Sequence, residues 1–211
     1  SITLKIVLII TVIGLVGIET TSFIAVIGTM GLAIGLALQG SLANFAGGII
    51  ILTVRPFRVG DYIDAEGTVG TVRSINILNT TLVSPHNQVI FVPNGPLAGG
   101  TITNYSMEPT RRLDLTFGIG YNDDIPTAKT ILKEIINDEQ RILTEPVPVI
   151  AVQDLADNSV NLIVKAWVNT PDYFDVFHDM KEKVKLEFDQ KGISIPFPQR
   201  EIHVYDHKPQ S

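Results

Sequence analysis

Cysteine is absent from this chain of 211 residues, which excludes disulfides and thiolate chemistry but does not identify the compartment. Charge is nearly absent from Ser1 to Val54, where only Lys5 and Glu19 are ionised. Because these two charges cancel, the net charge of −6 belongs to the residues beyond Val54. The sequence therefore predicts a lipid-soluble head joined near Arg55 to a water-soluble body.

The body also lacks clustered Lys and Arg. Phosphate binding needs such clusters, so we expect no nucleic-acid partner. The first apolar run has neither a basic n-region nor a small-residue cleavage site, so we expect no signal peptide. The chain starts with Ser1 rather than Met, and we expect further residues before it in the complete protein.

Catalytic and metal-binding motifs are lacking too. Gly118-Ile-Gly120 could begin a dinucleotide fingerprint, but the third glycine position holds Asp123, whose carboxylate would repel a pyrophosphate. The histidines show no metal spacing: His86, His178, His203 and His207. The serines considered as nucleophiles lack the Gly-x-Ser-x-Gly elbow: Ser41, Ser84 and Ser106. We expect no enzyme, no catalytic residue, no metal and no cofactor.

Two long apolar stretches are present instead. Residues 2–18 are nearly all Ile, Val and Leu, about the minimum for a membrane-spanning helix. A polar turn at residues 19–22 separates them from residues 23–54, which exceed the roughly 30 Å of bilayer hydrocarbon and should tilt, bend or break. Arg55 and Arg58 follow at once, so the positive-inside rule places that end in the cytoplasm. We expect a membrane hairpin with both ends on the cytoplasmic side.

The second stretch is rich in small residues that let helix backbones approach closely: Ala25, Gly28, Thr29, Gly31, Ala33, Gly35 and Ala37. Leu32 and Leu36 lie one turn apart on one face of it. Residues 39–41 (Gln-Gly-Ser) predict a kink, and Gly47-Gly48 a second weak point. Beyond the kink we expect an interfacial helix with this apolar face: Leu42, Phe45, Ile49 and Leu52.

This helix has two interpretations. The simpler one is an ordinary transmembrane dimer, since small-xxx-small patterns are common. The other is a ring of identical helices around an axis, with Leu32 and Leu36 pointing inward. Two stacked rings of leucine make a hydrophobic constriction that closes a pore by dewetting.

Several sequence blocks together resemble one family. The longest is Gly28-Thr-Met-Gly-Leu-Ala-Ile-Gly-Leu-Ala-Leu-Gln-Gly-Ser-Leu-Ala-Asn-Phe-Ala-Gly-Gly48, followed by Arg55-Pro-Phe-Arg-Val-Gly-Asp61. The others are residues 67–72, 92–95, 104–106 and 192–199. In this combination the whole chain resembles the family of the small-conductance mechanosensitive channel.

The resemblance implies a homoheptamer in the bacterial inner membrane with three transmembrane helices per subunit, of which the first has no counterpart here. The third helices line the pore, and Leu32 and Leu36 form its seal. The packing positions are Ala25, Gly28, Thr29, Gly31, Ala33 and Gly35. Well-known members carry Ala where Thr29 stands, and we expect this larger, polar residue to alter helix packing and the ease of opening.

The resemblance also assigns hinge positions: Gln39, Gly40, Gly47 and Gly48. The positions that couple the membrane to the cytoplasmic part are Asn44, Arg55, Pro56, Phe57 and Arg58. The arginines have a simpler interpretation, which is compatible with coupling. They can act as a stop signal at the membrane surface, with lipid phosphates as partners.

The body has two patterns of elements. Short β-rich runs at residues 61–64, 68–75, 77–83, 88–92 and 101–105 predict a small closed barrel, which the resemblance identifies as an Sm-like β domain. A strand is expected at residues 113–120, a helix capped by Asp123-Asp124, a hairpin of 149–155 and 160–168, a helix at 174–190 ended by Gly192, and a last strand at 201–205. The order β-α-β-β-α-β fits a ferredoxin-like α/β domain. In the family the last strand closes a barrel at the base of a vestibule.

These expectations define four regions: membrane helices at 1–54, the Sm-like domain at 55–107, the ferredoxin-like domain at 108–198, and a strand and tail at 199–211. The expected function is an ion channel that opens under membrane tension during hypoosmotic shock and releases ions and small osmolytes. Membrane lipids and other copies of the chain are the expected partners. The alternatives are a channel modulated by ligand or voltage and, less favoured, a membrane-anchored scaffold that does not conduct.

Overall fold

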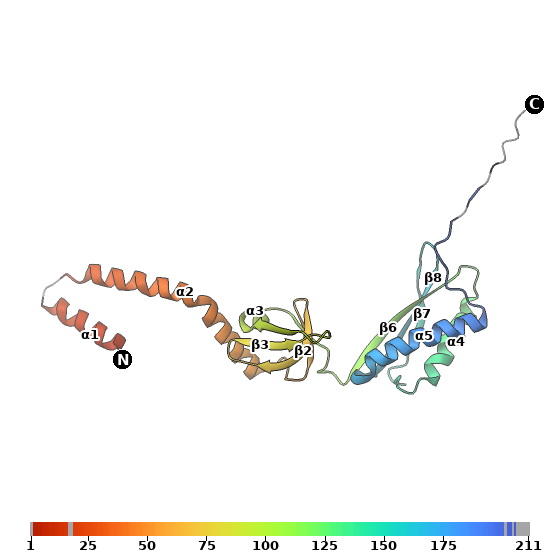
Figure 1. Ribbon diagram of the computed structural model, residues 1–211, viewed down its shortest axis with the longest axis horizontal. Coiled ribbons are helices and arrows are strands. Elements are labelled where there is room, and N and C mark those ends of the chain that lie inside the picture. The colour runs from red at the N-terminus through yellow and green to blue at the C-terminus, as the bar shows by residue number, and fades with distance from the viewer. Residues whose placement is uncertain (1, 17–18, 201, 204, 206–211) are drawn as a thin grey trace, which may run out of the picture. The chain divides into compact units, whose positions relative to one another are not determined.

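The computed structural model describes residues 2–16, 19–200, 202–203 and 205. The chain divides into two compact units, Ser1–Asn104 and Tyr105–Ser211. The first unit contains the apolar helices and a β-rich domain, and the second contains an α/β domain (Figure 1). Each unit has a hydrophobic core of its own.

The apolar head forms two helices, α1 (Ile2–Leu15) and α2 (Thr21–Val54). Among the described residues, α2 is the one helix long and apolar enough to cross a membrane. With 14 residues, α1 is shorter than the roughly 17–25 that a span takes. The sequence predicted two spanning helices, and among the described residues only α2 has the length and hydropathy of one.

The predicted kink at residues 39–41 does not interrupt α2, which is one continuous helix of 34 residues. Figure 1 shows it bending in its second half before it reaches the β-rich domain. Thr53 donates from Oγ1 to the Ile49 carbonyl, so its hydroxyl is satisfied within the helix. The bend thus curves a helix that stays intact, rather than joining two separate ones.

The β domain is a five-stranded antiparallel sheet in the order β4-β3-β2-β1-β5. Its strands are β1 (Tyr62–Ala65), β2 (Thr68–Ile75), β3 (Asn79–Val83), β4 (Val89–Pro93) and β5 (Ile102–Asn104). The turn from β1 to β2 is built by Glu66 and Gly67, both with positive φ, as a tight hairpin requires. A short helix that the sequence patterns did not predict, α3 (Asn94–Gly99), connects the edge strands β4 and β5. No pairing between the edge strands β4 and β5 closes this sheet within the described chain.

The core of the β domain takes side chains from both the sheet and the end of α2. Ile63, Val72 and Leu82 point inward from β1, β2 and β3 and are almost fully buried. Ile51 of α2 and Phe57 join the same cluster. Because α2 contributes to this core, its last turns belong to the β domain as much as to the membrane helix.

The second unit has a three-stranded antiparallel sheet in the order β6-β8-β7. The elements are β6 (Thr110–Ile119), α4 (Ile125–Asp138), β7 (Val149–Leu155), β8 (Val160–Asn169), the 3-10 turn η1 (Thr170–Asp172) and α5 (Tyr173–Lys191). Alternate residues of β6 and β8 pack against α4 and α5. Asp124 caps α4 by accepting from the Thr127 N–H at 2.8 Å, and Gly192 ends α5 with φ 74°, as the sequence predicted.

The order β-α-β-β-α is thus present, but the structure describes no strand after α5, where the sequence predicted one. Glu201 and Val204 lie outside the described residues, and Ile202, His203 and Tyr205 lie in no strand. A strand that pairs only with other copies has no partner within one chain. The terminal strand therefore stays a prediction.

Candidate functional site

Residues 21–40 of α2 are all exposed within the chain, although α1 lies beside Phe23 and Ile27. Leu32 and Leu36, the predicted seal, are 64% and 62% exposed. A Cβ at Gly28, Gly31 or Gly35 would meet no other atom within 4 Å. Exposed leucines and glycines of this kind have a use only if another apolar surface covers them.

The small residues of α2 form two separate faces. At about 100° per residue, Gly28, Gly31 and Gly35 lie on one face, and Ala25, Thr29 and Ala33 lie on another about 130° away. Leu32 and Leu36 lie between these faces. The leucine pair is therefore flanked on both sides by surfaces that a second helix backbone can approach closely.

Thr29, the residue that departs from the family pattern, has a satisfied hydroxyl. Its Oγ1 lies 2.9 Å from the Val26 carbonyl oxygen and 3.1 Å from that of Ala25. The hydrogen bond is internal to the helix, so Thr29 presents a methyl group to a neighbour without leaving a polar atom unpaired. When another helix packs on the Thr29 face, the larger side chain needs more space than alanine, but no unpaired hydroxyl is buried.

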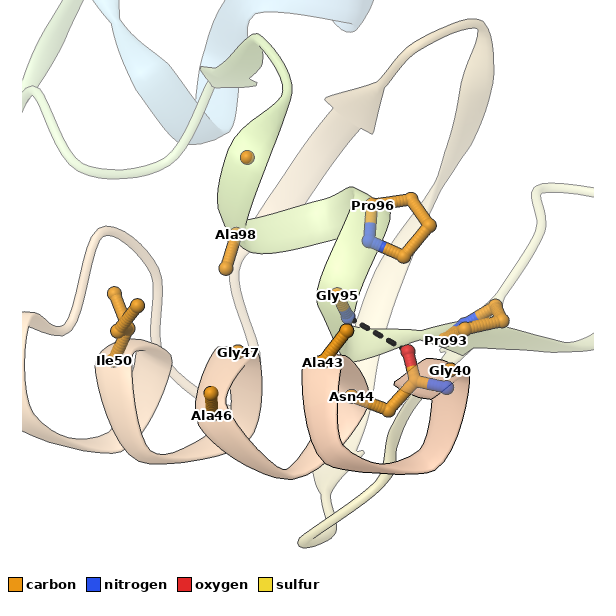
Figure 2. A pocket seen from close by; sticks show the side chains of 11 residues that line it. Gly40, Ala43, Asn44, Ala46, Gly47, Ile50, Pro93, Gly95, Pro96 and Ala98 are labelled. Carbon is orange, nitrogen blue, oxygen red and sulfur yellow. Dashed lines mark hydrogen bonds between the residues drawn. The ribbon is translucent and has the colours of Figure 1, made fainter. Parts of the chain in front are cut away.

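The second half of α2 is docked on the β domain by a polar contact. Asn44 Oδ1 accepts a hydrogen bond from the Gly95 N–H of α3 at 2.9 Å. Figure 2 shows Asn44 pointing from α2 toward the start of α3, with Ala43, Ala46 and Ile50 on the same helix. Between the two helices lies an apolar groove of about 590 Å³.

Gly47 and Gly48, predicted hinge residues, are buried at this contact. A Cβ on Gly47 would lie 2.6 Å from the carbonyl carbon of Asn94. A Cβ on Gly48 would collide with the Ile77 carbonyl and lie 2.8 Å from Nδ2 of Asn94. These two glycines therefore allow close approach of α2 to the β domain. Gln39 and Gly40 lie in the exposed part of the helix.

Asn94 organises this contact, and sequence reasoning did not single it out. It is fully buried; its Nδ2 donates to the carbonyls of Asn76 and Ile77, and its Oδ1 accepts from Thr80 Oγ1 at 2.8 Å. Every polar atom of the buried amide is therefore paired. The dipeptide Asn94-Gly95 after a strand was the available sequence sign of a turn, but not of its contact with a helix distant in the chain.

The predicted coupling residues at the end of α2 have different environments. Arg55 ends the helix with φ 55°, a left-handed conformation that is uncommon for residues other than Gly. Phe57 is buried in the core of the β domain, whereas the Pro56 carbonyl accepts from Asn104 Nδ2 at 3.2 Å. Asp61 Oδ2 accepts from both the Arg58 N–H and Asn104 Nδ2. The connection from α2 to β1 is thus tied to the end of β5.

Some carboxylates of the α/β domain have a lowered pKa because of hydrogen bonds. Hydrogen bonds from the Arg141 guanidinium lower the pKa of Glu139, and hydrogen bonds from Thr127 lower that of Asp124. Within the part of the chain that the structure describes, no group of three or more His, Asp or Glu could hold a metal ion. The described site around α2 consists of exposed helix surfaces and contacts with the main chain of the β domain.

Three consecutive regions match sequence profiles of known domains. Residues 1–39 match the mechanosensitive ion channel transmembrane helices 2/3, and residues 40–107 match the β-domain of the same channels. Residues 113–195 match the C-terminal domain of the mechanosensitive ion channel MscS. The chain belongs to the MscS family.

Individual MscS proteins agree with this assignment. The chain is 44% identical over 188 residues to an uncharacterized MscS family protein of Synechocystis sp., which covers 89% of this chain and 64% of that protein. It is 44% identical over 175 residues to the small-conductance mechanosensitive channel of Edwardsiella ictaluri, covering 83% of this chain and 61% of the relative. The chain thus spans somewhat less than two thirds of the length of these relatives.

Solved MscS structures confirm the predicted fold class. The closed state of Helicobacter pylori MscS superposes with a TM-score of 0.89 at 31% identity, covering 98% of this chain and 82% of that one. Arabidopsis thaliana MSL1 has the same fold, with a TM-score of 0.76 at 18% identity. Membrane helices, an Sm-like β-barrel domain and a ferredoxin-like α/β domain therefore follow one another as predicted.

Proposed function

We propose that the chain is the pore-forming and cytoplasmic part of a mechanosensitive channel that opens under membrane tension. The observation that carries the proposal is the exposed first half of α2. Leu32 and Leu36 are exposed between two faces of exposed small residues, and a Cβ at any glycine of the Gly28, Gly31 and Gly35 face would meet no atom within 4 Å. A monomeric anchor in lipid has no need of two close-packing faces on either side of a leucine pair.

A closed ring gives both faces a partner. Each copy would pack its Gly28, Gly31 and Gly35 face against the Ala25, Thr29 and Ala33 face of the next copy. In a ring of about six to eight copies, the directions to the two neighbours differ by about 120–135°, close to the separation of these faces. The same packing turns Leu32 and Leu36 toward the axis. The heptamer implied by the family resemblance falls within this range.

The gate in this proposal is a hydrophobic constriction. Stacked leucine rings narrow enough to exclude water block ions without a physical plug. Tension favours the state with larger in-plane area, so the α2 helices separate, the constriction wets, and ions and small osmolytes pass. This function needs membrane lipids and other copies of the chain but no catalysis or cofactor. It places the protein in the bacterial inner membrane, crossing it more than once, with both soluble domains in the cytoplasm.

The docked half of α2 gives the gate a connection to the cytoplasmic domains. Asn44 bonds to Gly95, and Gly47 and Gly48 touch the main chain of the β domain. When the first half of α2 tilts, this contact must either move with it or break. We propose that Asn44 and residues 55–58 couple the pore helix to the β domain in this way.

Patch-clamp recording tests the proposal directly. The protein is reconstituted into bilayers that contain no other channel, and suction is applied in steps. We expect step currents only above a tension threshold. If no current appears up to membrane rupture, although native mass spectrometry verifies a ring assembly, the result would indicate a channel gated by ligand or voltage instead of by tension. Silence together with a dimer would indicate a scaffold.

A further inference from the structure

Strand β6 has an open edge in the α/β domain. It pairs with β8 along its whole length, from Thr110 to Ile119, and no other strand of the described chain pairs with its opposite edge. In a ferredoxin-like sheet the last strand of the same chain occupies this position. A long unpaired edge readily pairs with an additional strand, so the fold must determine which strand, if any, pairs with β6.

The segment after α5 arrives at this edge and begins to pair with it. The Gly120 N–H, at the end of β6, donates to the Ser194 carbonyl at 3.2 Å. In an antiparallel pair alternate residues direct their N–H groups toward the same neighbour. If the segment continued along β6, residues 196 and 198 would face the edge as Ser194 does. Both are proline and have no N–H to donate.

Side chains then hold the segment on a different course. Asp123 Oδ2 accepts hydrogen bonds from Gly120 N, Ser194 N and Ser194 Oγ at 2.8–2.9 Å. Further along, Asn158 Oδ1 accepts from the Gln199 N–H at 2.7 Å. Asn158 lies in the turn between β7 and β8, so the segment crosses the end of the sheet and leaves the β6 edge free.

The crossing segment is held at its ends and spans a hollow. The space beneath it measures about 400 Å³ and is lined in part by Tyr121, Asn122 and Asp157. Two prolines within six residues stiffen the span, because each fixes its own φ. Beyond it, Ile202 and Tyr205 are 78% and 83% exposed, so these apolar side chains have little cover within the chain.

We propose that Asp123 and Asn158 are positioning residues which, with Pro196 and Pro198, keep the terminal segment off its own β6 edge and present it to other copies of the chain. This inference rests on the proposed function in one respect, because it assumes assembly of several copies. Without the device, the terminal strand could complete the sheet of its own domain. A terminal strand that pairs with its own sheet would not be available to form a strand barrel shared among subunits.

The test restores pairing to the edge. In the triple variant Asp123→Ala/Pro196→Ala/Pro198→Ala, residues 196 and 198 regain their N–H groups and the Asp123 contacts are gone. Hydrogen exchange on the whole protein in detergent should show the β6 amides that do not pair with β8 becoming about tenfold slower. Native mass spectrometry should show a smaller fraction of the full ring. Asp157→Asn is the matched control, since Asp157 lines the same hollow and makes no hydrogen bond to the segment in the described structure.

The double variant Pro196→Ala/Pro198→Ala leaves Asp123 and its hydrogen bonds to Gly120 and Ser194 in place, and it should shift both readouts in the same direction by less. If the triple variant does not fold, the double variant provides the test of the inference. Unchanged exchange at the β6 edge together with an unchanged ring would overturn the inference. Failure of the proposed function is distinguishable, because it appears as absence of tension currents in the unmodified protein, whereas the inference compares β6 exchange between variants.

Discussion

Glycine has two distinct uses along α2, and residue-scale geometry separates them. Gly28, Gly31 and Gly35 have open space around the position a Cβ would take, so their use depends on a partner outside the chain. Gly47 and Gly48 lie against the main chain of the β domain. Sequence patterns could show that α2 is rich in small residues, but not which of them contact another part of the same chain.

Gly48→Ala should weaken the docking of α2 on the β domain. The added methyl group would collide with the Ile77 carbonyl, a backbone atom that cannot rotate away. We expect a loss of about 1–3 kcal/mol in the stability of the β domain, measured by hydrogen exchange of β3 and α3 amides. Gly99→Ala is the matched control, because a Cβ there meets nothing within 4 Å, and equal effects of the two would contradict the assignment.

Glu139 should give the α/β domain a pH dependence on the acid side. Hydrogen bonds from Arg141 lower its pKa in the folded protein, so its contribution to stability is complete above the ordinary carboxyl pKa. It is lost as the pH falls through the lowered value. In Glu139→Gln the thermal midpoint of the domain should fall less steeply on acidification, as followed by circular dichroism. An unaltered slope would show that the pair contributes nothing to acid sensitivity.

At the scale of elements, α2 combines a membrane helix and a domain-docking helix in one uninterrupted ladder. The sequence predicted a kink near Gln39 because Gly and polar residues weaken a helix locally. The helix bends in its second half and does not break, since its backbone hydrogen bonds continue to Arg55, whose N–H donates to the Ile51 carbonyl at 2.9 Å. An intact helix can transmit a tilt of its first half to the β domain.

Leu36→Ser should make the closed pore easier to open. Each copy loses roughly 2 kcal/mol of apolar character at the constriction, so the constriction wets at lower tension. Patch-clamp recording should show a lower threshold, and cells that carry the variant should grow more slowly because of leak. Leu38→Ser is the matched control, since Leu38 is similarly exposed in the chain but lies on another face of α2. A threshold shift in Leu38→Ser equal to that of Leu36→Ser would contradict the assignment of the seal.

Among the other elements, strong periodic patterns were predicted best. The strands β2 (Thr68–Ile75) and β7 (Val149–Leu155) have the bounds that the sequence indicated. The short helix α3 was missed because Asn94-Gly95-Pro96 reads as a turn, and six residues are too few to show helical periodicity. Its position is decided by contacts of Asn94 and Gly95 with α2 and β3, which lie far away in the sequence.

At the scale of the whole molecule, the two units should respond separately to core mutations, because each has its own hydrophobic cluster. Leu82→Ala should destabilise the β domain by about 2–5 kcal/mol, because it removes buried apolar atoms and leaves a cavity. Val164→Ala should destabilise the α/β domain for the same reason but by less, because fewer atoms are removed. Both side chains are fully buried. Hydrogen exchange should accelerate in the mutated unit alone. Acceleration in both units for either variant would mean that they unfold as one.

The sequence by itself determined the lipid-soluble head, the acidic body, the leucine pair between small residues, and the order of the strands and helices other than α3 and the terminal strand. These features follow from hydropathy, periodicity and spacing, which are local properties of the chain. Only the tertiary structure decided that Gly47 and Gly48 are contact residues, that Asn94 is the buried centre of the α2 contact, and that Asp123 accepts hydrogen bonds from Ser194. Each of these depends on atoms brought together from distant parts of the chain, and local pattern carries no information about which of them will meet.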